Sequence, residues 1–202
     1  MIIYHPSASL PYTPIKVAFI TGLSNPSSCS LSREYKQFLS QLDCPEAWKI
    51  YLNFPYIPSQ EEVEEEVEKV FILNASLANF QQFIGARSHH YRQAVQRHLI
   101  NVLTSTDRLF LVVGSCGLEI LNQAWTDVIP ADRIKIVALG PVARHRPQAS
   151  GLLVQGTRDS ISRLFFQDVD VRLPDVGHMD YVRDHRVFEL VSQSLTHLQA
   201  IS

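Results

Sequence analysis

The chain has 202 residues, of which 46% are hydrophobic and 19% are charged, and its formal net charge is -2. This length is enough for one buried core, so we expect residues 1–202 to form a single domain. The near-neutral charge argues against a nucleic-acid-binding protein, because such proteins usually carry a clustered basic excess. Plentiful apolar residues, with only 8 glycines and 11 prolines, exclude a disordered or collagen-like chain.

The cysteines and the N-terminal segment predict a cellular setting. Cys29, Cys44 and Cys116 form neither an even disulfide framework nor a zinc-binding spacing. The first residues, Met1 to Pro14, lack the basic and then apolar layout of a signal peptide. No uninterrupted apolar run approaches the roughly 18 residues that a membrane helix needs. We therefore expect a soluble, cytoplasmic protein with no membrane span.

The first half of the chain alternates short β-branched runs with segments of helical periodicity. Many glutamates surround the apolar stripe of one predicted helix, and we interpret them as a solvated face rather than a metal site. The predicted elements are, in chain order, a strand at Ile15–Ile20, a helix from Ser32, a strand at Trp48–Phe54, the acidic helix from Ser59, a helix over Asn74–Gly85, and a helix from Tyr91 that ends before Asp107.

The second half repeats this rhythm at closer spacing. Its predicted elements are a strand at Leu109–Val113, a helix at Gly117–Trp125, strands at Ile134–Leu139 and Leu152–Gln155, a helix at Ser160–Phe165, a strand at Val169–Leu173, and a helix that spans Val187 to Leu198. Such alternation predicts an α/β fold, a three-layer α/β/α sandwich around a mostly parallel sheet.

Chemically useful side chains follow three of the predicted strands. One strand ends in Gly114-Ser115-Cys116-Gly117 and turns directly into a helix, as a nucleophile on a tight turn with small neighbours would. The next two strands of interest are followed by Asp159 and by His178. Because ligands bind beyond the carboxyl ends of parallel strands, we expect a serine or cysteine, an aspartate and a histidine to meet there.

This chain order resembles that of the α/β-hydrolase superfamily. The resemblance extends from Val17-Ala18-Phe19-Ile20-Thr21-Gly22-Leu23 to Gly177-His178-Met179-Asp180-Tyr181, in a small member without a lid. It implies a serine hydrolase that cleaves a small-molecule carboxylic ester or thioester and needs neither a cofactor nor a metal.

The resemblance also implies a role for each residue of the site. Ser115 would be the nucleophile, His178 its general base, and Asp159 the acid that orients the imidazole. The backbone N–H groups of Cys116 and of Leu23, which follows the first strand, would hold the oxyanion.

The turn at the nucleophile departs from the Gly-x-Ser-x-Gly pattern, because Val113 occupies the first glycine position. With Ser115 as nucleophile, Gly117 fills the second small position. With Cys116 as nucleophile, Leu118 would stand where a small residue is needed. An ungapped match along the preceding strand favours Ser115, and Cys116 remains the alternative nucleophile.

Ordinary structural roles compete with these assignments. Ser115 suits a turn at the start of a helix, Asp159 suits the N-cap of the helix that follows it, and His178 suits a loop that bonds to backbone. A catalytically silent binding module with an α/β-hydrolase fold is therefore the alternative function. The loop after Thr21-Gly22 lacks Gly-x-Gly-x-x-Gly, and the chain has no P-loop, which argues against a nucleotide-binding enzyme.

Overall fold

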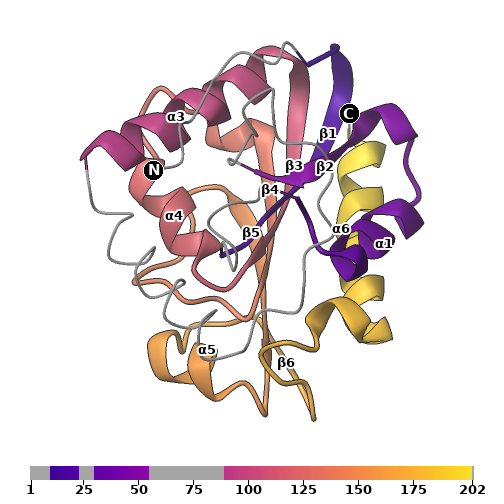
Figure 1. Ribbon diagram of the computed structural model, residues 1–202, viewed down its shortest axis with the longest axis vertical. Helices are drawn as coiled ribbons and strands as arrows, with labels where there is room; N and C mark the ends of the chain where they lie inside the picture. Colours follow the sequence, from indigo (N-terminus) through magenta and orange to yellow (C-terminus); the bar gives the residue numbers. More distant parts are fainter. Residues whose placement is uncertain (1–9, 23–29, 55–88, 202) are drawn as a thin grey trace.

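The computed structural model describes residues 10–22, 30–54 and 89–201 (Figure 1). Leu23 and the two helices predicted from Ser59 and over Asn74–Gly85 lie outside the described residues. Each of the other predicted strands and helices is found, with ends that differ by a few residues. The last predicted strand, Val169–Leu173, is shorter in the structure than expected, since it begins at Val171.

The described residues form six strands and five α-helices, with short 3-10 turns between some of them. The elements are β1 (Thr13–Ile20), α1 (Arg33–Gln41), β2 (Lys49–Asn53), α3 (His89–Thr104), β3 (Thr106–Gly114), α4 (Gly117–Ala124), β4 (Ile134–Leu139), β5 (Ser150–Gly156), α5 (Ser160–Phe165), β6 (Val171–Leu173) and α6 (His185–Ala200). All neighbouring strands pair in parallel, in the order β2-β1-β3-β4-β5-β6.

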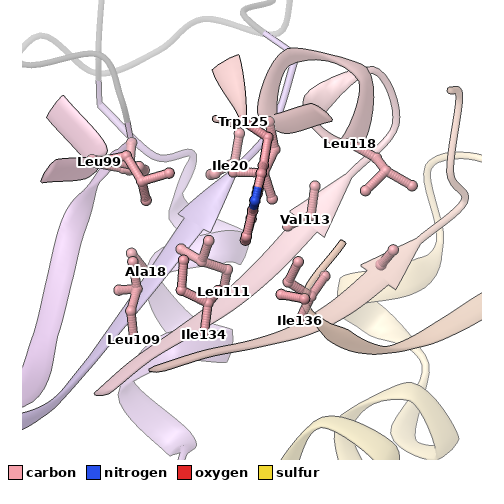
Figure 2. Packing of buried hydrophobic residues seen from close by; sticks show 14 of the residues in the cluster. Ala18, Ile20, Leu99, Leu109, Leu111, Val113, Leu118, Trp125, Ile134 and Ile136 are labelled. Atoms are coloured by element: carbon pink, nitrogen blue, oxygen red, sulfur yellow. The ribbon is translucent and has the colours of Figure 1, made fainter. Parts of the chain in front are cut away.

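Helices cover both faces of this sheet and make the fold a three-layer α/β/α sandwich (Figure 1). Helices α3 and α4 lie on one face, and α1 and α6 lie on the other. Residues Leu109–Val113 of strand β3 are buried from both sides, which explains this uninterrupted apolar run. Leu109, Leu111 and Val113 pack with Trp125 on the α4 side (Figure 2), whereas Phe110 and Val112 belong to the cluster on the α6 side.

The strand order reverses direction at β1, since the chain builds outward from β1 to β2 on one side and to β3 on the other. Loops that follow the strands on either side of such a reversal diverge and leave room for a ligand. Ile20 is paired with Val113, so β1 and β3 end side by side. The loop after β1 and the turn after β3 therefore open from the same point of the sheet.

Gly117, the first residue of α4, lies directly against the end of β1. A Cβ at this position would stand 2.4 Å from the carbonyl oxygen of Ile20, which is main chain and has little freedom to move. Gly114 lies three residues earlier, and a Cβ there would meet its nearest neighbour, the Cγ2 of Thr21, at an ordinary 3.5 Å. The close approach of α4 to β1 thus requires glycine at 117 but not at 114.

We expect Gly117→Ala to lower the free energy of unfolding by about 1–3 kcal/mol, because the new methyl group must displace backbone. Gly114→Ala is the matched control and should change it by less than about 1 kcal/mol. Urea unfolding of both variants measures the difference. Equal losses in the two variants would contradict the close packing described at Gly117.

Candidate active site

Ser115 sits on a left-handed turn between β3 and α4. Its φ of 52° is uncommon for a residue with a side chain. Two backbone hydrogen bonds hold the turn: the Ser115 N–H donates to the Leu139 carbonyl at 3.1 Å, and the Ser115 carbonyl accepts from the Val142 N–H at 3.0 Å. Strained backbone of this kind persists where surrounding contacts determine it, and here the end of β4 and the loop after it supply them.

The hydroxyl of Ser115 begins a continuous chain of side-chain hydrogen bonds. The Nε2 atom of His178 lies 3.0 Å from Ser115 Oγ, and its Nδ1 atom lies 2.9 Å from both carboxylate oxygens of Asp159. The three residues come from the ends of β3 and β5 and from the loop after β6, as the sequence predicts. This is the arrangement in which an imidazole can take a proton from a serine hydroxyl.

Asp159 is completely buried, and three donors surround its carboxylate. Besides His178, the Ser162 N–H donates to Oδ1 at 2.8 Å, and the Tyr181 hydroxyl donates to Oδ2 at 2.7 Å. Burial alone would raise the pKa of Asp159, but His178, the Ser162 N–H and the Tyr181 hydroxyl together hold it below its ordinary value. Asp159 therefore caps α5 and also faces His178. The capping role considered from the sequence and the role of orienting the imidazole are compatible in this one carboxylate.

Cys116 lies next to Ser115 in the chain but points into the core. Its side chain packs in a small buried cluster with Val95, Ile120 and Ala124. Burial raises the pKa of the Cys116 thiol to about 12, so the reactive thiolate is scarce at neutral pH. The backbone N–H of Cys116 stands at the N-terminus of α4, where the first amides have no partner within the helix. This geometry suits an oxyanion donor better than a nucleophile.

The other predicted oxyanion donor, Leu23, lies outside the described residues, but the chain just before it is well fixed. The Thr21 N–H donates to the side-chain oxygen of Asn53 at 2.9 Å, and the Asn53 amide donates back to the Thr21 carbonyl at 3.3 Å. Asn53 is buried at the end of β2. The amide therefore orients the start of the loop that leaves β1.

Sequence reasoning missed two residues that support this site, Asn53 and Tyr181. Asn53 ends the edge strand, where its polar side chain signals a contact with the neighbouring loop. Tyr181 follows His178 by three residues, and only its position near the histidine could have singled it out. Asp180, by contrast, bonds within its own loop and accepts the Gly177 N–H at 2.9 Å.

Two arginines follow β4, and both contact carboxylates of this chain. Arg146 pairs with Asp168 at 3.2 Å and with Asp170 at 2.8 Å, just ahead of β6 rather than beyond the carboxyl ends of the strands. Arg144 lies 3.8 Å from buried Glu119, which also accepts its backbone N–H. Neither residue adds support for an anionic substrate.

No model of a known protein family matches the chain, and no curated protein sequence matches it. Within residues 10–22, 30–54 and 89–201, no helix combines the length and apolar character needed to cross a membrane. Over the same ranges, no group of three or more histidine, cysteine or acidic side chains is arranged to hold a metal ion.

The lowered pKa of Asp159 predicts how stability depends on pH. The folded protein binds this proton more weakly than the unfolded chain, so the carboxylate stabilises the fold above its unfolded pKa of about 3.9. That contribution is lost as the pH falls through the folded pKa. We expect the difference in unfolding free energy between wild type and Asp159→Asn to shrink as the pH falls from about 6 to below about 4.

Urea unfolding at a series of pH values measures this difference. Asp127→Asn, at an exposed carboxyl group, is the control and should leave the pH dependence of wild type unchanged. A wild-type advantage over Asp159→Asn that stays constant across the range would contradict the stabilised carboxylate.

Proposed function

We propose that the protein is a serine hydrolase that cleaves a carboxylic ester or thioester. The observation that supports this best is the hydrogen-bond chain from Ser115 Oγ through His178 to the buried Asp159. A left-handed turn places the half-buried serine at the end of β3, next to the N-terminus of a helix. Nucleophile, base, orienting acid and anion-stabilising amide thus meet at one point of the sheet.

The geometry suggests a two-stage reaction. Ser115 Oγ attacks the substrate carbonyl carbon while His178 Nε2 takes the hydroxyl proton, and the carbonyl oxygen becomes an oxyanion. The Cys116 N–H and the start of α4 stabilise that charge. The tetrahedral species collapses to an acyl-serine, and His178 delivers the proton to the departing alcohol or thiol.

Water then regenerates the enzyme by the same groups. His178 takes a proton from the water, whose oxygen attacks the acyl carbon, and the proton returns to Ser115 Oγ as the carboxylic acid leaves. Throughout, Asp159 keeps its charge and holds the imidazole with Nδ1 toward the carboxylate, which leaves Nε2 free for the serine.

The proposal includes a cytoplasmic setting and a small acyl substrate. Cys44 and Cys116 are both free thiols, as is usual in a reducing compartment. The connection from β4 to β5, residues 140–149, is short and contains no helix, so it does not form a lid over the serine.

A catalytically silent binding module would have no need of the complete hydrogen-bond chain, and the buried thiol of Cys116 disfavours the cysteine mechanism.

An alkyl fluorophosphonate should label wild-type protein at Ser115, because this reagent phosphonylates activated serine hydroxyls. Tandem mass spectrometry of the peptide spanning Leu109 to Asn122 locates the adduct. We expect His178→Ala to lower the labelling rate by at least about 100-fold through loss of the general base. Labelling absent in folded wild-type protein would refute the serine mechanism and favour the silent binding module.

The cysteine mechanism makes the opposite prediction for a matched pair of variants. Cys116→Ala should keep hydrolysis of a p-nitrophenyl ester within about threefold of wild type, whereas Ser115→Ala should lose at least about 100-fold. Initial rates measured at neutral pH decide between them. Activity that survives Ser115→Ala and disappears in Cys116→Ala would make Cys116 the nucleophile.

A further inference from the structure

Tyr181 contributes a hydroxyl to the candidate site from the 3-10 turn Tyr181–Arg183, three residues after His178. Its ring is buried in the core cluster on the α6 side, with 5% of the residue exposed. The hydroxyl donates to Asp159 Oδ2 at 2.7 Å and accepts the Gly156 N–H at 2.9 Å. It therefore links the end of β5 to the carboxylate and to the loop that carries the histidine.

The hydroxyl completes the set of donors around a buried carboxylate. Asp159 Oδ1 accepts from the Ser162 N–H and from His178, and Oδ2 accepts from His178 and from Tyr181. A carboxylate has about four lone-pair positions, and a buried one that lacks a donor is costly. Without the Tyr181 hydroxyl, Asp159 Oδ2 would keep only the hydrogen bond from His178, the residue that also faces Ser115.

The space around this contact admits no other group on one side. Gly140, at the end of β4, has a φ of +55°, and a Cβ there would lie 2.6 Å from Asp159 Oδ2 and 2.7 Å from the Tyr181 ring. Glycine thus lets the phenol and the carboxylate pack directly against the main chain. A phenylalanine at 181 would fill the same core volume, so the packing alone does not require the hydroxyl.

We propose that Tyr181 is a positioning residue of the Ser115–His178–Asp159 site, whose hydroxyl fixes the carboxylate of Asp159 so that His178 faces Ser115. This inference rests on the proposed hydrolase function. The Tyr181 hydroxyl bonds to Asp159 and to the Gly156 N–H rather than to Ser115, so it acts through Asp159. A displaced acid would let the imidazole rotate, which lowers the fraction of molecules aligned for proton transfer.

The titratable groups that face this contact are few within the described residues. His178 faces Asp159 directly, and Asp180 is close enough to raise the pKa of the Tyr181 phenol further, after burial and the bond to Asp159 have raised it. The phenol therefore remains protonated, and a donor, at neutral pH. The bond from Tyr181 also lowers the pKa of Asp159.

Tyr181→Phe tests the proposal, and Tyr51→Phe is the matched control. Tyr51 lies on edge strand β2, and its hydroxyl donates a hydrogen bond to the carboxylate of Glu46. The control therefore removes the same kind of donor from a carboxylate outside the site. Saturation kinetics of alkyl fluorophosphonate labelling give a maximal rate and a half-saturating concentration. We expect Tyr181→Phe to lower the maximal rate about tenfold and to leave the half-saturating concentration within about twofold.

A second measurement needs no turnover. Carbon-13 NMR of the Asp159 carboxyl group, followed against pH, should show a higher pKa in Tyr181→Phe than in wild type and no change in Tyr51→Phe. Replacing Tyr181 with 3-fluorotyrosine keeps the hydroxyl, makes it a stronger donor and should move the pKa of Asp159 in the opposite direction. This substitution also preserves a test if Tyr181→Phe fails to fold.

The two measurements separate the two proposals. An unchanged Asp159 titration in folded Tyr181→Phe, or in the 3-fluorotyrosine protein, overturns the positioning role. A fall in thermal stability with an unchanged maximal labelling rate overturns it as well, since that is the result of a purely structural contact. If wild type is not labelled at all, the hydrolase proposal fails, and the NMR titration still decides whether Tyr181 controls Asp159.

Discussion

A negative charge buried at the carboxyl end of the sheet is the constraint on which the site depends. Asp159 is fully buried, and an isolated carboxylate in such a place would be protonated or would destabilise the fold. The chain meets this demand with donors from several directions: the first turn of α5, the histidine loop and the turn that carries Tyr181. Each donor fixes the position of its own segment, so the demand for hydrogen bonds also assembles the site.

The turn at Ser115 is the second constraint, and it explains how the chain departs from Gly-x-Ser-x-Gly. Val113 occupies the first position of that pattern, and its side chain packs in the core cluster on the α4 side of the sheet (Figure 2). The second position cannot vary in this way, because Gly117 stands against the main chain of Ile20. Steric demand at this turn is therefore concentrated on the helix side of the serine.

The sequence was sufficient to predict the α/β class, the parallel sheet and the meeting of Ser115, Asp159 and His178. Strand periodicity and the position of each residue after a strand carry that information, because parallel strands end at one edge. Tyr181 and Asn53 escaped prediction for a physical reason: a phenol or an amide suits many surroundings, so neither residue type points to a particular partner. The burial of the Cys116 thiol, which disfavours the alternative nucleophile, became visible only with the direction of its side chain in the fold.

The edges of the sheet bear on how the molecule meets other chains. Parallel sheets end in rows of backbone groups that can recruit a further strand, and long, flat edges promote association. Here β6 has three residues and is followed directly by Pro174, while β2 has five and carries an antiparallel bridge from Ser30 to Leu52. The register also shifts between Ala18 and Phe19, where β1 meets β2. Among the residues that the structure describes, both edges of the sheet are therefore short or interrupted, which is one way in which natural sheets limit pairing with a further strand.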